Sequence, residues 1–325
     1  MREHRNSPVL AMLAAVAVLG LAVSYFFLPA DVVPERAITD IRWLSIMLAL
    51  ACFCVTAVSM GLLNYSSFLF TSDTRLLYLP YLVTVLSIPG AMHLGPYHVS
   101  ALLMIWSVFY AMRYVESEHV RMGYAFGAVI FAGTASMLVP SMVYAEIYIF
   151  LFCFYVRGQA FVRYLLSSIA AASVPWIYVL SWCYLRPESL QAVEYLRFFR
   201  EGMALSLPEI GGMPLMDMIW AGFCLLLGLR AIVFVLARGR ERNKAQKNAF
   251  GLSVALSVVC LLATVFCREY REPLSVIVTA VPFSFLVFDL FTNGRRIEAG
   301  LWISLLVLAA AAMRVSEFLP GLLQS

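Results

Sequence analysis

Charged residues are scarce in this sequence. Only 13% of its 325 residues are Asp, Glu, Lys or Arg, whereas 62% are hydrophobic. Soluble globular domains carry about 25% charged residues, so this chain would expose a large apolar surface in water. The mean hydropathy of +0.87 points the same way. The sequence therefore predicts an all-α bundle of transmembrane helices with the lipid bilayer as its main partner.

The common enzyme signatures are also missing. The chain has no P-loop, no GxGxxG, no HExxH and no GxSxG motif, which argues against ATP hydrolysis. Its net charge of +4 is small and scattered, so nucleic acid is not expected as a partner. No cofactor and no bound metal are predicted.

The seven cysteines form no CxxC pair, and most lie inside apolar stretches. This pattern is typical of small buried hydrophobic residues. A disulfide between Cys183 and Cys267 is the alternative, because both are expected near the outer surface.

Eleven stretches are apolar enough to be membrane spans. The start of the chain is interpreted as a retained first span, because its apolar stretch is too long for a signal peptide. A span needs about 20 residues to cross the hydrocarbon core. The predicted spans are 9–28, 43–63, 76–91, 98–112, 122–139, 141–156, 161–185, 214–236, 250–266, 274–291 and 300–313.

Two of these divisions depend on proline and glycine. As one helix, 122–156 would be about 52 Å long, more than a bilayer needs. Pro140 in its middle favours a hairpin of two spans. The stretch 76–112 is divided in the same way by Pro89-Gly90 and Gly95-Pro96. A re-entrant loop remains the alternative at either hairpin.

Lysine and arginine predict the orientation, because cytoplasmic loops carry an excess of both. With the N-terminus in the cytoplasm, the larger share of basic residues falls inside, including the cluster at 238–247. Merging either hairpin into one span would move that cluster outside. The pattern therefore predicts a cytoplasmic N-terminus and an external C-terminus.

One long polar stretch, 186–213, interrupts the apolar sequence. It predicts an amphipathic helix at 187–202 on the outer surface, which begins at Pro187 and ends near Gly202. Its apolar face is predicted to hold Leu190, Val193, Leu196 and Phe199. We expect one integral-membrane domain, 1–325, with a front block of spans at 9–185 and a rear block at 214–313.

Ionisable residues at membrane depth are costly to bury and often mark functional sites. Glu146 is the leading candidate, because it lies within a predicted span between Tyr144 and Tyr148. In an ion- or proton-coupled transporter it would be the titrating group. The competing interpretation is a carboxyl that is bonded to a nearby tyrosine or reached by water.

Four further residues are weaker candidates. Asp289 is expected at the membrane interface, paired with the basic turn at Arg295-Arg296. Arg230 is expected to extend its side chain toward the basic cluster. Asp31 and Asp40 lie in the first outer loop, where glycosyltransferases that use polyprenyl-linked sugars place an acidic residue. His93 and His98 flank the turn of the 76–112 hairpin, but no nearby acid or cysteine completes a metal site, so two outer-loop histidines are expected.

The stretch 60–310 resembles a family of polytopic inner-membrane proteins of Bacteroidetes that carries a domain of unknown function. The landmarks are small, proline and basic residues at spaced positions, among them Leu79-Pro80-Tyr81-Leu82, Gly123, Gly127, Pro140, Arg157, Arg163, Val174-Pro175-Trp176, Val281-Pro282-Phe283-Ser284 and Asp289. The resemblance implies a multi-pass protein of the bacterial inner membrane. It implies no activity and no catalytic residues.

Three functions remain open from the sequence. The first is transport or flipping of a small or lipid-linked envelope component, with Glu146 as the coupling site. The second is a non-catalytic subunit of an envelope assembly or secretion complex, for which other envelope membrane proteins would be partners. The third is a polyprenyl-sugar glycosyltransferase or polymerase that uses the first-loop acids with Arg186, Arg197 and Arg200.

Overall fold

The computed structural model describes residues 7–27, 41–67, 75–88, 90–116, 121–156, 161–185, 192–206, 215–238, 244–267 and 273–316. These residues are almost entirely helical. The helices are α1 (Ser7–Phe27), α2 (Arg42–Ser67), α3 (Arg75–Leu86), α4 (Pro96–Glu116), α5 (Met122–Leu138), α6 (Val143–Val156), α7 (Phe161–Leu185), α8 (Ala192–Met203), α9 (Leu215–Ala237), α10 (Lys244–Phe266), α11 (Val276–Asn293) and α12 (Arg296–Ser316).

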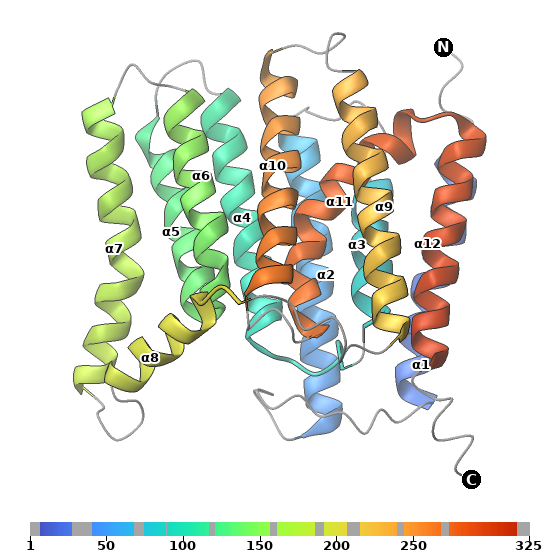
Figure 1. Cartoon of the computed structure of the whole chain (residues 1–325), viewed down its shortest axis with the longest axis horizontal. Coiled ribbons are helices and arrows are strands. Elements are labelled where there is room, and N and C mark those ends of the chain that lie inside the picture. Colours follow the sequence, from blue (N-terminus) through green and yellow to red (C-terminus); the bar gives the residue numbers. More distant parts are fainter. Residues whose placement is uncertain are drawn as a thin grey trace.

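Successive helices other than α8 run alternately between the two ends of the bundle (Figure 1). The first residues of α1 lie at one end, together with the end of α9 and the start of α10. The last residues of α12 lie at the opposite end, where α8 also lies (Figure 1). The helices that flank the basic cluster 238–247 are thus on the same side as the start of α1.

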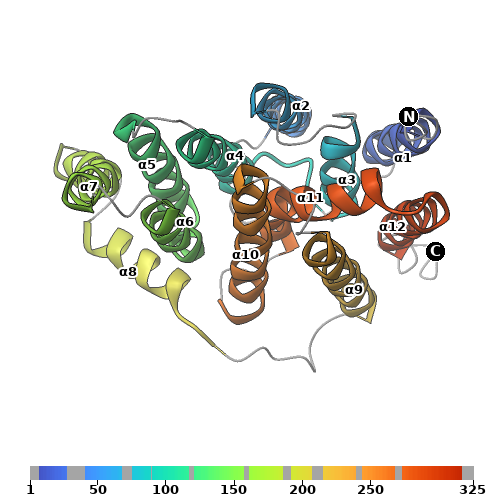
Figure 2. The same ribbon diagram turned by 90° about the horizontal axis from the view of Figure 1, so that it is seen from above.

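Helix α11 forms the centre of the bundle. It contacts α3, α4, α9 and α10, and Figure 2 shows it between them. Most of its residues are buried, as expected of a helix that is surrounded by others. By contrast, α7 lies at the edge and packs mainly on α5. Only 17% of its apolar stretch is buried, against 72% for α11, so most of α7 is left to face lipid.

Six of the described helices are long and apolar enough to cross a membrane, namely α2, α4, α7, α9, α11 and α12. Each of the other predicted spans also coincides with an apolar helix, but over a shorter described stretch. The chain is therefore an all-α membrane protein with several spans. Helix α3 is about 18 Å long at 1.5 Å per residue, too short to cross the hydrocarbon core alone.

The connection from α3 to α4 is buried inside the protein rather than exposed as an outer loop. Its described residues, 87–88 and 90–95, are all buried. Gly90 has φ of 70°, a left-handed conformation that glycine adopts without strain. Side chains satisfy the buried backbone: Tyr25 donates to the carbonyl of Ile88, and Ser45 Oγ accepts from Leu94 N–H at 2.8 Å.

The predicted break at Pro140 is present. Helix α5 ends at Leu138, and Val139 is extended. A single 3-10 turn, η1 (Pro140–Met142), then leads into α6. Because proline lacks an N–H and fixes φ, it suits the first position of the new turn.

The predicted amphipathic helix is present as α8, although its expected start at Pro187 lies outside the described residues. The face that packs on the bundle differs in part from the predicted one. Phe199 is buried as predicted, and Leu190 lies outside the described residues, but Val193 is 74% exposed and Leu196 is 47% exposed, whereas Tyr195 is buried. The helix is turned so that its aromatic side chains fill the space under α5 and α7.

All seven cysteines are free. Cys183 and Cys267 are both buried as thiols, so the alternative of a disulfide between them is not realised. Cys153 and Cys260 are also buried, as predicted for small apolar residues. Cys54 is an exception, because it is exposed on α2.

Candidate functional site

Glu146 lies where three helices meet. It is in the first turn of α6, and the break at Val139 and Pro140 folds that turn back against the end of α5. Ser136 of α5 is 2.9 Å from Oε2 of Glu146. A Cβ added to Gly133 of α5 would lie 3.1 Å from Oε1 and 3.5 Å from Cγ of Pro175 in α7. The carboxyl is therefore held between α5 and α7.

The same serine hydroxyl also contacts the backbone of α5. Ser136 Oγ is 2.8 Å from the carbonyl oxygen of Gly133. One hydroxyl has one proton to donate, while both of these neighbours can act as acceptors. Which of them receives the proton depends on whether Glu146 itself carries a proton.

Glu146 is partly buried, and no ion pair to it is found among the described residues. Its next residue on α6, Ile147, is 52% exposed, as is Leu151 one turn further. Both side chains suit contact with lipid. An acidic group in such surroundings is costly unless it is protonated or bonded. The expectation that a neighbouring tyrosine bonds to Glu146 is not met: Tyr144 donates to the carbonyl of Met203, and Ser136 is the partner instead.

Helix α8 covers this region from the end of the bundle. Tyr195 and Phe199 of α8 pack with Met137 of α5. Trp176, which follows Pro175 in α7, contacts the Phe199 ring edge-on at 4.7 Å between ring centroids. The Tyr195 hydroxyl donates to the carbonyl of Met137 at 3.0 Å. Burial raises the pKa of Tyr195 to about 12, so it stays a neutral donor.

Asp289, which was expected at the membrane interface, lies four residues before the end of α11 and is buried, only 2% exposed. Its Oδ1 accepts a hydrogen bond of 3.0 Å from Nδ2 of Asn293, one turn later in the helix. The bond satisfies one carboxylate oxygen within the same helix. Asp289 thus contributes to the end of α11 and lies apart from Glu146.

Arg230 does not simply extend toward the basic cluster. It forms an ion pair with Glu298 of α12, and its guanidinium lies 6.0 Å from the ring centroid of Phe234. The pair joins α9 to α12. The sequence did not reveal Glu298 as the partner, because the two residues come from separate spans.

The two histidines are buried in the connection between α3 and α4, contrary to the expectation of exposed loop residues. Nδ1 of His98 accepts from Gly95 N–H at 3.2 Å, and Nε2 lies 2.8 Å from the carbonyl of Ala91. Both ring nitrogens are thus engaged in closing the turn, which leaves neither for a metal. The described residues hold no group of His, Cys, Asp and Glu that could bind a metal.

Asp31, Asp40 and Arg186 lie outside the described residues. Of the residues expected at a glycosyltransferase site, the structure therefore describes Arg197 and Arg200. Of these, Arg197 pairs with Glu201 on its own helix at 2.9 Å, and Arg200 is exposed on α8.

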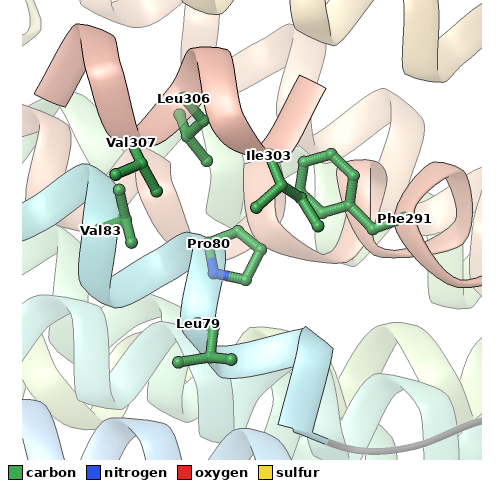
Figure 3. A pocket seen from close by; sticks show the side chains of 7 residues that line it. All are labelled: Leu79, Pro80, Val83, Phe291, Ile303, Leu306 and Val307. Carbon is green, nitrogen blue, oxygen red and sulfur yellow. The ribbon is translucent and has the colours of Figure 1, made fainter. Parts of the chain in front are cut away.

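An apolar pocket lies between α3, α11 and α12 (Figure 3). Pro80, Phe291, Ile303 and Val307 are among the side chains that line it, and none of the lining residues is polar. It shares no helix with the Glu146 site. The pocket offers no group for acid–base chemistry or ion binding.

Ser136 was the residue missed at this site. A signal for it exists in the sequence, since Ser136 and Glu146 lie at equal distances from Ser141 on either side of the Pro140 break. Residues placed in this way face each other in a tight hairpin of helices.

Comparison with protein-family models, curated proteins and solved structures finds no match to this chain.

Proposed function

We propose that this protein moves a small or lipid-linked envelope component across the bacterial inner membrane, with Glu146 as the coupling site. The observation that carries this proposal is the position of the carboxyl. It lies between α5, α6 and α7, bonded to Ser136, and no basic partner for it is found among the described residues. A carboxyl kept in such a place is costly, which favours a functional role.

The local backbone supports the same proposal. The site lies beside an interrupted segment, where α5 ends, η1 follows and α6 begins. Gly133, which faces Glu146, also faces Pro175, a proline inside α7 that removes one helical hydrogen bond. Transporters commonly build their ion and substrate sites at interrupted membrane helices.

The topology belongs to the proposal as well. We infer eleven crossings, one of which is made by α3 together with the buried connection that follows it, with the N-terminus in the cytoplasm and the C-terminus outside. The alternating helix directions in Figure 1 support an odd number of crossings. The basic cluster between α9 and α10 supports a cytoplasmic start. The bacterial inner membrane as the location belongs to this proposal, because it is what the sequence resemblance to the Bacteroidetes family implies.

Purified protein in liposomes provides the test. Fluorescently labelled phospholipid and polyprenyl phosphate serve as probes of lipid translocation, and a panel of small envelope precursors serves as probes of solute uptake, each with an imposed pH or sodium gradient. We expect one probe to move faster than in protein-free liposomes. Glu146→Gln should abolish the gradient-driven part of that movement.

Glu201→Gln is the matched control, because Glu201 is 55% exposed on α8 and undergoes the same chemical change. It should transport like the unmodified protein. Unchanged gradient-driven transport in Glu146→Gln would reject Glu146 as the coupling site. Failure to move any probe, together with stable copurification of another envelope membrane protein, would instead favour the non-catalytic subunit.

A further inference from the structure

We propose that the ion exchanged at Glu146 is a proton. Ser136 is the positioning residue, whose hydroxyl accepts a hydrogen bond from the protonated carboxyl. This inference rests on the proposed coupling role of Glu146 and identifies the ion that couples there. It follows from the count of hydrogen-bond donors and acceptors at the site, together with the apolar atoms that surround it.

The count favours a protonated carboxyl. Ser136 Oγ lies 2.8 Å from the Gly133 carbonyl and 2.9 Å from Glu146 Oε2. When Glu146 is ionised, Ser136 can donate its one hydroxyl proton to the carboxylate or to the Gly133 carbonyl, but not to both. With Glu146 protonated, the carboxyl donates to Ser136 Oγ and Ser136 donates to Gly133. Both short contacts are then hydrogen bonds.

The neighbouring charges do not favour the ionised form. Charged and titratable side chains on the elements that pack around α6 are engaged or placed elsewhere. On α4, Arg113 pairs with Glu116 at the far end, and His98 bonds within its own turn. On α5 to α7, Arg121 and Tyr124 are bonded to each other, Tyr144 and Tyr164 are bonded to backbone carbonyls, and the Tyr148 ring lies beside Phe152. On α8, Tyr195 is bonded to the Met137 carbonyl, Arg197 is paired with Glu201, and Glu194 and Arg200 are exposed. The other described groups are Tyr97, Tyr110 and Tyr114 of α4, the exposed Tyr155, Arg163, Tyr178, Tyr184 and Lys247, and the buried thiols Cys153, Cys183, Cys260 and Cys267.

The same atoms offer a metal cation fewer oxygen ligands than it needs. Hard cations take about six oxygen ligands. The oxygens brought together here are the two of Glu146, the hydroxyl of Ser136 and the Gly133 carbonyl. The Pro175 ring, which lies near Gly133, adds only carbon atoms. A proton needs only the carboxylate and one acceptor.

The exchange step is a simple acid–base reaction. A hydronium ion gives its proton to Oε2 of the Glu146 carboxylate and leaves as water. The new O–H donates to Ser136 Oγ, whose own proton turns to the Gly133 carbonyl. Release reverses these movements, and Ser136 then donates to the carboxylate again.

Infrared difference spectroscopy of the protein in liposomes tests this step. Spectra over a pH series should contain the carbonyl stretch of a protonated carboxylic acid, and Glu146→Gln should remove one such band. Ser136→Ala should shift that band to higher frequency and move its pH midpoint, because the acid loses its acceptor. Ser136→Thr keeps the hydroxyl and should restore both. If Ser136 had a merely structural role, Ser136→Ala would leave the frequency of the Glu146 band unchanged.

The outcomes separate this inference from the proposed function. No band assigned to Glu146 at any pH, or a band that disappears when sodium is added at constant pH, would overturn the proton as the coupling ion. The coupling role would still stand if Glu146→Gln abolished transport. Normal transport in Glu146→Gln would overturn the coupling role itself, and this inference with it, even where the band titrates.

Discussion

Small residues on α5 determine how closely the neighbouring helices approach. Gly127 faces the ring of Tyr110 on α4, and Gly133 faces Glu146 and Pro175. Gly123, by contrast, has open space around its missing side chain. The pair Gly123 and Gly127 therefore looks like one motif in the sequence, but only Gly127 is needed for packing.

Gly127→Ala should destabilise the protein by about 1–3 kcal/mol, the usual effect of forcing extra atoms into a packed interior. Its new Cβ would lie 2.7 Å from Cδ1 of Tyr110, so the ring or the helix must move. Gly123→Ala is the control, and alanine's better helix propensity should leave stability unchanged or raise it by up to about 1 kcal/mol. Denaturant titration in detergent measures both; equal effects would contradict the assigned packing role.

Arg230 and Glu298 should be energetically coupled, because they are partly buried partners, 37% and 24% exposed, on two helices. A double-mutant cycle with Arg230→Gln and Glu298→Gln should give a coupling of about 0.5–3 kcal/mol. The Arg197–Glu201 pair, 74% and 55% exposed, is the comparison and should give about 0.3–0.5 kcal/mol. Strict additivity at Arg230 and Glu298 would refute the pairing.

At the level of elements, α8 acts as a cover for the end of α5 and the middle of α7. Its aromatic residues meet Met137 and Trp176, while its charged residues stay exposed. Beyond α8 the chain joins α10, where Ser206 N–H donates to the carbonyl of Phe266 at 2.7 Å. The cover is thus fixed at two points, and Tyr144, two residues before Glu146, donates to the carbonyl of Met203 at its end.

Tyr195→Phe should loosen α8 without unfolding the bundle. The change removes the hydrogen bond to the Met137 carbonyl and keeps the ring, at a cost of about 0.5–1.5 kcal/mol. Hydrogen exchange followed by mass spectrometry should show faster exchange for residues 192–203 and no change in α11. Tyr184→Phe, at a side chain 86% exposed, is the control. Identical exchange in the two variants would mean that the Tyr195 bond does not hold α8.

At the scale of the molecule, the helices form two groups on either side of α2, α4, α10 and α11. Helices α5 to α8 lie on one side, and α1, α3, α9 and α12 lie on the other (Figure 2). Glu146 belongs to the first group and the Arg230–Glu298 pair to the second. A conformational change between the groups would therefore pass through α4, α10 and α11.

The proposed topology makes a prediction for the whole chain. In a variant whose native cysteines are replaced, Asn243→Cys should react with a membrane-impermeant thiol reagent only from the cytoplasmic side. Glu194→Cys on α8, which is exposed at the opposite end, should react only from outside. Labelling of both positions from one side would refute eleven crossings.

The sequence by itself determined where the helices are. An apolar stretch that enters the bilayer predicts a helix, because backbone groups in lipid must form their hydrogen bonds within their own segment. The eleven stretches coincide with helices, and Pro140 divides α5 from α6, since proline cannot continue a helix across that point. It also predicted α8 as an amphipathic helix, which the structure contains, and Glu146 as a carboxyl at membrane depth, which stays a prediction.

Only the tertiary structure decided which helix faces meet. A helix that is apolar on all sides carries no pattern to show its neighbour, so pairs such as Arg230 with Glu298 were not predictable. The burial of the α3–α4 turn, the side of α8 that packs inward, and the need for glycine at 127 have the same origin. Each depends on close contact between segments distant in sequence. The contact of Ser136 with the partly buried carboxyl of Glu146 is another example, on which the proposed proton exchange rests.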